Sequence, residues 1–268
     1  MMNEYLQFAR VLARRAGRLI HSLEGRCSAK TKSTELDLVT KADKLSEKLI
    51  ISAIRKRFPQ HQILSEEDAG SIRRYNSEFI THNSSLCWVI DPLDGTTNFS
   101  HSFPFYCVSI ALVQGQTPLI GAVYSPALDE LFSAVKGKGA WLNDGRIKVS
   151  KVKRLTSGML CTGFPYIIRQ KPGDNFRNFQ RFCLTAQAVR RAGAAALDLC
   201  YLAMGRLDGF WERELKPWDT AAGALIAQEA GGKVSDFKGG PFRLFGKREI
   251  LASNGLIHNE MVRVINRG

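Results

Sequence analysis

The chain has 268 residues, of which 44% are hydrophobic and 24% charged. This ordinary globular composition excludes general disorder, and the length is sufficient to bury one large core or two lobes. No apolar run approaches the ~20 residues of a membrane-spanning helix, and the N-terminal arginines do not fit a secretory signal. Six scattered cysteines without a CxxC pair favour a reduced, cytoplasmic protein that does not enter a membrane.

The formal net charge is +13. Such a charge can attract nucleic acid, an anionic membrane or anionic substrates. The basic residues occur in small groups rather than in a long run or tail, which favours an ordinary solvated surface over a nucleic-acid footprint. Charge alone therefore does not assign a function, and RNA binding stays an alternative.

Helical spacing of apolar residues predicts a helix over residues 5–23, with Gly25 as its stop. A second amphipathic helix is expected from about Lys44 to Pro59. Residues 62–65 predict a short strand that ends at Glu66. The compact apolar run 86–90 is typical of a buried strand and stops at Asp91.

Successive strands are predicted over 106–113, 118–124 and 130–135, and the Asn-Asp-Gly sequence at 143–145 indicates a hairpin. Strands and helices alternate after about residue 155. Helices are expected over 176–182, 194–204, 220–230 and 257–265, and strands over 207–211 and 249–252. We therefore expect an α/β or α+β protein with two lobes, about 1–150 and 151–268, in one compact body.

Acidic residues of this basic chain gather at the ends of predicted elements, where side chains can converge. Mg²⁺ prefers oxygen ligands, and carboxylates brought close together repel one another unless a cation binds. The pattern therefore predicts a magnesium site. The residues are Asp37 and Asp43, Glu66 and Glu67, Asp91 and Asp94, Glu212, and Asp219.

The segment 91–96 combines metal ligands with a phosphate cradle. Asp91 ends the buried strand, Asp94 follows in the turn, and the Leu93 carbonyl can face the same metal. Gly95 permits close backbone approach, and Thr96 can open a helix whose N-terminus attracts phosphate. A polar turn with Thr96 as a helix cap is the alternative, but the other acidic segments favour the metal site.

Residues 88–99 (WVIDPLDGTTNF) resemble the first signature of the inositol monophosphatase family, and residues 218–232 resemble the second. Segments 37–43 and 65–67 match two further blocks of the family in the same order. The resemblance covers nearly the whole chain, and segments 163–165 and 190–193 are similar to bacterial members. It implies a single catalytic unit with a layered αβαβα sandwich of the sugar-phosphatase, fructose-1,6-bisphosphatase-like type, usually homodimeric, in which residues 151–268 supply Asp219.

By this resemblance, two or three Mg²⁺ ions bind at the acidic residues. Glu66, Asp91 and the Leu93 carbonyl would hold one ion, and Asp91, Asp94 and Asp219 the second, with Asp91 as the bridge. Glu66 would also help to hold a third ion. Glu67 either reaches the metals or faces solvent.

The resemblance also implies hydrolysis by a metal-activated water near Glu66, without a covalent phosphoenzyme. Thr96, oriented by Asp43, would accept the proton of that water or position it. Lys32 aligns with a lysine near the metals and phosphate, and a mobile surface lysine is the alternative. Asp37 is interpreted as a structural residue.

On the substrate side, Glu212 aligns with the family's acceptor for substrate hydroxyls, and pairing with Arg213 is the alternative. Gly95 and Thr96 would hold the phosphate, while Gly193, Ala194 and Ala195 would meet the substrate through their backbone. The family often has a hydroxyl residue where Ala194 stands, a departure that leaves the exact substrate open.

The resemblance implies a Mg²⁺-dependent, lithium-sensitive phosphatase acting on myo-inositol 1-phosphate or a related polyol or sugar phosphate. Fructose 1,6-bisphosphate, NADP and 3′-phosphoadenosine 5′-phosphate are alternative substrates, because the related enzymes share the metal core. A protein that binds RNA or the transcription machinery is an alternative of another class. It is motivated by the pI of about 9.7 and by some bacterial relatives.

Overall fold

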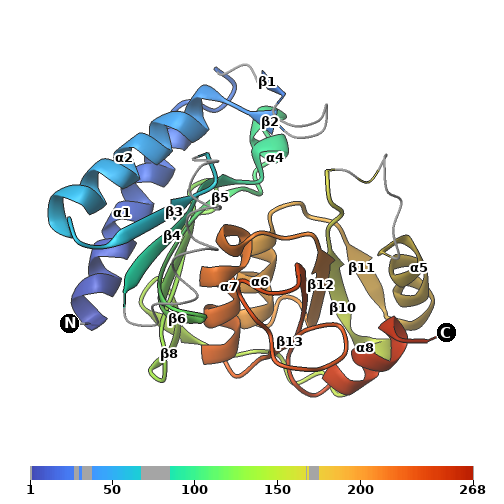
Figure 1. Ribbon diagram of the computed structural model, residues 1–268. Coiled ribbons are helices and arrows are strands. Elements are labelled where there is room, and N and C mark those ends of the chain that lie inside the picture. Colours follow the sequence, from blue (N-terminus) through green and yellow to red (C-terminus); the bar gives the residue numbers. More distant parts are fainter. Residues whose placement is uncertain are drawn as a thin grey trace.

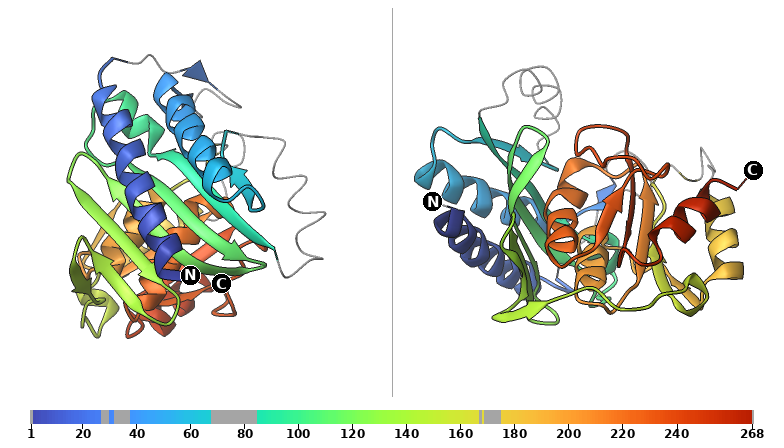
Figure 2. Two further views of the ribbon diagram at one scale, coloured as in Figure 1. Left: turned by 90° about the vertical axis from the view of Figure 1, so that its left-hand side faces the viewer. Right: turned by 90° about the horizontal axis from the view of Figure 1, so that it is seen from below.

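The computed structural model in Figure 1 describes residues 2–26, 30–31, 38–67, 85–166, 168 and 175–267. Helices and sheets alternate along the molecule in five layers, and the two chain termini lie at opposite ends of the stack (Figures 1 and 2). The protein is thus an αβαβα sandwich, as the family resemblance implied.

The first layer consists of α1 (Met2–Ser22) and α2 (Lys41–Arg57), which lie side by side on one face of a seven-stranded sheet (Figure 2). Strands β3 and β4 are parallel, and the others pair antiparallel in sequence order. The strands are β3 (Gln62–Ser65), β4 (Leu86–Asp94), β5 (Cys107–Gln114), β6 (Thr117–Ser125), β7 (Glu130–Val135), β8 (Gly139–Leu142) and β9 (Gly145–Ile147). A separate ribbon pairs β1 (Lys30–Thr31) with β2 (Leu38–Val39).

The middle layer consists of α6 (Ala195–Ala203) and α7 (Pro217–Glu229), which pack against each other between the two sheets. Both helices are apolar around most of their circumference, as expected for helices that are covered on all sides. Small residues permit close contact: a Cβ atom on Gly121 of β6 would lie 3.0 Å from the backbone of Ala222 in α7.

The second sheet has the strand order β11-β10-β12-β14-β13. Its strands are β10 (Met159–Thr162), β11 (Ala188–Arg190), β12 (Gly209–Arg213), β13 (Lys233–Ser235) and β14 (Glu249–Ser253). Helices α5 (Asn175–Thr185) and α8 (His258–Ile265) cover its outer face, where the ring centroids of Phe182 and Trp211 lie 4.2 Å apart. The short helices α4 (Thr96–Ser100) and η1 (Leu155–Ser157) complete the described elements.

The structure corrects several predicted boundaries. Strand β4 does not stop at Asp91 but continues to Asp94, because a bulge keeps the segment paired with β5. Helix α2 begins at Lys41, since Thr40 caps it, and α7 begins at Pro217 rather than at residue 220. Five short strands, β1, β2, β10, β11 and β13, were not predicted, because so few residues carry little periodicity.

The two sheets lie on either side of residue 150 in the sequence, and the middle helices pack on both. None of the helices in the described ranges combines the length and the apolar composition that a membrane span requires.

Candidate active site

Four carboxylates from three parts of the fold meet at one end of the first sheet. Asp91 and Asp94 lie in the bulged end of β4, and Glu66 directly follows the neighbouring parallel strand β3. The Glu66 N–H donates to the Ile90 carbonyl at 3.2 Å, which continues the β3–β4 pairing by one residue. Asp219 comes from the first turn of α7, which packs against β4.

The ionisation of these carboxyls reflects their proximity. Burial raises the pKa of Asp91 well above its ordinary value, and the charges of Glu66, Asp94 and Asp219 raise it further. A hydrogen bond with Glu66 acts in the same direction. Burial also raises the pKa of Asp94, to about 7, and burial with the charges of Glu66 and Asp94 raises that of Asp219. A cation bound here would relieve the repulsion.

The donor atoms suit Mg²⁺, because all of them are oxygens. Asp91 Oδ1 accepts from the Leu93 N–H at 3.0 Å, so the side chain folds back over the turn that carries the Leu93 carbonyl. Among the described residues, no group of three or more His, Cys, Asp or Glu side chains lies so that it could hold a metal ion by itself. Mg²⁺ does not need one, since it is usually held by one or two carboxylates together with waters and substrate phosphates.

A buried hydroxyl and carboxylate lie beside this cluster. The Thr96 Oγ1 atom lies 3.0 Å from Asp43 Oδ1 and 3.1 Å from the Leu93 carbonyl oxygen. The other Asp43 oxygen, Oδ2, accepts from the Thr40 N–H at 2.7 Å and from the Thr40 hydroxyl at 2.6 Å. Asp43 is therefore fixed by the N-terminus of α2, and it and the Leu93 carbonyl are the two acceptors within reach of the single proton of the Thr96 hydroxyl.

Asp94 connects the acidic centre to the middle helices. Its Oδ2 atom accepts from the Ala196 N–H at 2.8 Å, in the first turn of α6. Ala194, the N-cap residue of α6, has no side-chain acceptor of its own. Asp94 thus supplies the cap that a Ser or Thr would normally provide.

Asn98 holds the segment before α6 against the end of β4. Its Nδ2 atom donates to the Phe105 carbonyl at 2.7 Å and to the Ala192 carbonyl at 2.8 Å. Gly193 has φ +92° and packs on this amide, while a Cβ atom on Gly95 would lie 3.3 Å from Ala194 Cβ. The segments 93–98 and 192–196 therefore meet, although about a hundred residues separate them.

Glu212 lies near the end of β12 and is buried. Burial raises its pKa well above the ordinary value, and the charges of Asp198, Asp219 and Asp94 add to this, while Arg191 opposes it. Gly163 makes room for the side chain, because any Cβ atom at that position would overlap the Glu212 carboxylate. Glu212 thus lies close enough to the acidic centre for the charges of Asp94 and Asp219 to raise its pKa.

The structure brings together most of the residues that the sequence predicted for this site: Asp43, Glu66, Asp91, Leu93, Asp94, Gly95, Thr96, Gly193, Ala194, Ala195, Glu212 and Asp219. Lys32 and Asp37 lie outside the described residues. Glu67 follows Glu66 beyond the end of β3 and is partly buried, and its role stays a prediction.

Sequence reasoning missed three residues. Asn98 was read only as part of a signature, although its bonds to two loops position the site. Tyr166 keeps 46% of its surface exposed, but partial desolvation and the charges of Glu66, Asp94 and others raise the pKa of its phenol, which places it near the acidic centre. Asp198 is buried in α6, and its Oδ1 atom has no hydrogen-bond partner in the described part of the chain. A lone acid within the apolar run 194–204 was the signal for it.

A five-layered αβαβα sandwich with carboxylates converging at the end of β4 and the start of α7 defines a class of α/β proteins. The sequence model of the Inositol monophosphatase family matches residues 1–267, and the chain belongs to this family.

Relatives and solved structures agree with this assignment. The inositol-1-monophosphatase of Synechocystis sp. is 44% identical over 268 residues, which cover 98% of this chain and 89% of the relative. The Nus factor SuhB of Pasteurella multocida is 45% identical over 243 residues, covering 89% and 87%. The structure of inositol monophosphatase from Anabaena (Nostoc) sp. PCC 7120 superimposes with a TM-score of 0.85 at 40% identity, covering 98% of this chain and 95% of that one. The extragenic suppressor protein suhB from Bartonella henselae gives 0.88 at 37% identity, covering 99% of both.

Proposed function

We propose that this protein is a Mg²⁺-dependent phosphomonoesterase that hydrolyses myo-inositol 1-phosphate or a closely related polyol or sugar phosphate. The observation that carries the proposal is the mutual electrostatic perturbation of Glu66, Asp91, Asp94 and Asp219 beside the Thr96–Asp43 hydrogen bond. Membership of the inositol monophosphatase family supports the same reaction.

Two or three Mg²⁺ ions fit the oxygen donors of the site. Glu66, Asp91 and the Leu93 carbonyl would hold one, Asp91, Asp94 and Asp219 a second, and Glu66 would help with a third. When bound, the ions lower the pKa of water and stabilise charge on the phosphoryl and leaving oxygens. Without them, the phosphate group of a substrate would be repelled by the carboxylates.

The protein itself orients the attacking water. Because the Thr96 hydroxyl donates its proton to Asp43 Oδ1, its lone pairs remain to accept a hydrogen bond from that water. Glu66 would accept the second hydrogen bond and fix the direction of attack on phosphorus. The N–H groups at Gly95 and Thr96 would bind the phosphate oxygens.

Glu212 gives the site its preference for polyols, because a buried carboxylate can accept hydrogen bonds from two neighbouring hydroxyls. The backbone of Gly193, Ala194 and Ala195 would contact the substrate ring from the other side. Since Ala194 contributes only a methyl group, the pocket makes one polar contact fewer than a hydroxyl residue would. Fructose 1,6-bisphosphate, NADP and 3′-phosphoadenosine 5′-phosphate are therefore included in the test.

The test is phosphate release from myo-inositol 1-phosphate with and without Mg²⁺, followed by the same assay on the three alternative substrates. Asp91→Asn should abolish turnover, whereas Asp144→Asn should not, since the Asp144 side chain is 98% exposed. Lithium should inhibit the reaction. If the protein hydrolyses only one of the alternative substrates, the proposed reaction stands and the proposed substrate is wrong. If none of the four compounds is hydrolysed in a Mg²⁺-dependent way, the proposal is refuted.

A second candidate function is binding to RNA or the transcription machinery, which the name of the 45%-identical Nus factor SuhB favours together with the net charge of +13. This role would coexist with catalysis. Filter binding to RNA at physiological salt tests it, because a purely electrostatic interaction weakens steeply as salt is raised. We also expect the protein to be cytoplasmic and to form a homodimer. Light scattering of the purified protein would measure the molar mass and so test the dimer.

A further inference from the structure

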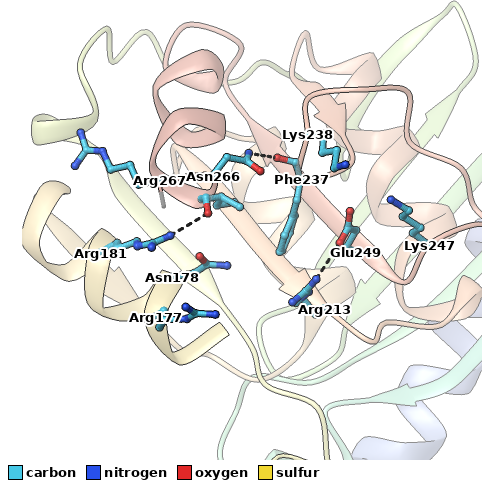
Figure 3. A pocket seen from close by; sticks show the side chains of 11 residues that line it. Arg177, Asn178, Arg181, Arg213, Phe237, Lys238, Lys247, Glu249, Asn266 and Arg267 are labelled. Carbon is cyan, nitrogen blue, oxygen red and sulfur yellow. Dashed lines mark hydrogen bonds and ion pairs between the residues drawn. The ribbon is translucent and has the colours of Figure 1, made fainter. Parts of the chain in front are cut away.

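A second concave site lies on the outer face of the second sheet. It is a hollow of about 300 Å³ between α5, the end of β12, the end of α8 and the segment 237–249 (Figure 3). Its lining is unusually basic. Among the residues that the structure describes, six cationic side chains contribute to it, Arg177, Arg181, Arg213, Lys238, Lys247 and Arg267, with one carboxylate, Glu249.

This hollow is separate from the acidic site, because successive residues of a strand point to opposite faces of the sheet. On β12, Phe210 belongs to the core between the two sheets, and Trp211 to the core under α5 and α8. Glu212 therefore faces the middle helices, whereas Arg213 faces the outer layer. The sheet itself separates the two sites.

Two of the arginines are held in place by the protein. Arg181 Nη1 donates to the Ile265 carbonyl at 3.0 Å, at the last turn of α8. Arg213 pairs with Glu249 at 3.4 Å, and its guanidinium lies over the ring of buried Phe237 at 5.4 Å. These contacts fix the floor of the hollow.

The remaining cations lie at the rim. Arg177, Lys238 and Lys247 are exposed and come from α5 and from the segment 237–249. In Figure 3, the Arg177 side chain points in the direction of Arg213, while Arg267 extends away from the other side chains. Since Glu249 already pairs with Arg213, the lining keeps a positive charge of several units within a small concave volume.

We propose that this hollow binds a compact anion that carries two or more phosphate groups. Guanidinium groups match phosphate oxygens in a two-pronged geometry, and lysines add point charges around them. One phosphate group offsets only part of the lining charge, whereas a di- or triphosphate can reach the floor and the rim together. A volume near 300 Å³ is at the small end of ligand pockets and suits such an anion better than a nucleic-acid strand, which follows an open groove.

Isothermal titration calorimetry with inorganic tripolyphosphate tests the proposal. EDTA in the buffer keeps metals out of the acidic site, whose carboxylates then repel the probe. The variant Lys238→Gln/Lys247→Gln removes two rim cations and leaves Arg181, Arg213 and their contacts in place. The matched control Lys151→Gln/Lys153→Gln makes the same change of charge at two exposed positions outside the hollow.

The wild-type protein and the control should bind one tripolyphosphate, and the rim variant should bind about tenfold more weakly or worse, as expected for lost charged hydrogen bonds. Equal binding by both variants, or no binding by the wild type, would overturn the proposal. If inorganic phosphate binds as tightly as tripolyphosphate, the proposal that the ligand carries two or more phosphate groups is wrong. Binding of a short RNA that needs the rim lysines, and that tripolyphosphate does not displace, would assign the surface to nucleic acid instead. Phosphatase activity should be the same in both variants, so the proposed function is tested independently.

Discussion

The Thr96 hydroxyl lies 3.0 Å from Asp43 Oδ1, although 53 residues separate the two in the sequence. Asp43 in turn accepts two hydrogen bonds from Thr40, so the start of α2 sets the position of this acceptor for the Thr96 hydroxyl. A helix cap and the hydroxyl that we propose to orient the attacking water thus share one carboxylate.

Thr96→Ala should lower kcat for phosphate release by about 10²–10⁴-fold, because the hydroxyl that accepts from the attacking water is lost. Thr96→Ser keeps that hydroxyl and should stay within about tenfold of the wild type. Steady-state assays at saturating Mg²⁺ measure both, with circular dichroism to verify folding. Equal activity of the alanine and serine variants would contradict the assigned role.

Asp91→Asn should make the metal-free protein more stable while abolishing activity. The amide keeps the acceptor for the Leu93 N–H and removes one charge from the crowded carboxylates, a gain of about 1–3 kcal/mol in the free energy of unfolding. Mg²⁺ at a hundred times its Kd should stabilise the wild type by about 2.7 kcal/mol and the variant much less. Urea unfolding in EDTA and in Mg²⁺ measures both effects, and equal Mg²⁺ stabilisation of the two proteins would refute Asp91 as a ligand.

Gly163→Ala should impair substrate binding rather than chemistry. The added methyl group would overlap the Glu212 carboxylate and displace it from the pocket. We expect KM for myo-inositol 1-phosphate to rise about 5- to 100-fold, corresponding to ~1–3 kcal/mol of lost hydrogen bonding, with a smaller change in kcat. Gly145→Ala is the control, since its nearest neighbour would be an ordinary 3.6 Å away. An unchanged KM in Gly163→Ala would argue against Glu212 as a substrate contact.

Asn98→Ala removes the amide that bridges the Phe105 and Ala192 carbonyls. Two partly buried acceptors lose their donor, which should cost about 1–3 kcal/mol of stability and raise KM by loosening the segment before α6. Urea unfolding and steady-state kinetics check the two consequences. If stability falls while KM stays constant, Asn98 supports the fold without positioning the substrate.

His258 should make stability depend on pH. It is buried between the Ser235 and Ser253 hydroxyls, each at 2.9 Å, and burial together with the nearby Lys233 lowers its pKa to about 4. As the pH falls from about 6.5 towards 4, the unfolded chain gains a proton on this residue that the native state excludes, so its contribution to stability is lost. The stability difference between the wild type and His258→Gln should therefore shrink over this range. Urea unfolding measures the free energy of unfolding of both proteins. If their difference stays constant over this pH range, His258 does not titrate in this way.

Local sequence was sufficient for most long elements. The apolar spacing in α1 and the hairpin at residues 143–144 follow from side-chain period and turn chemistry, which act within a few residues. The bulge that carries β4 from Asp91 to Asp94 was not predictable, because it depends on pairing with β5. Asp198 was overlooked for a similar reason: only packing decides whether an acid in a helix is buried.

The sequence by itself determined the family, the acidic segments and the chemistry that their residue types support. Only the tertiary structure decided that Asp94 caps α6, that Gly163 makes room for Glu212, and that Glu212 and Arg213 serve opposite faces of one sheet. The same holds for the basic hollow, whose cations come from four separate segments. Residue types and short-range spacing can be read directly from the sequence. Distances between remote segments, in contrast, are set by the packing of two sheets around a shared layer of helices.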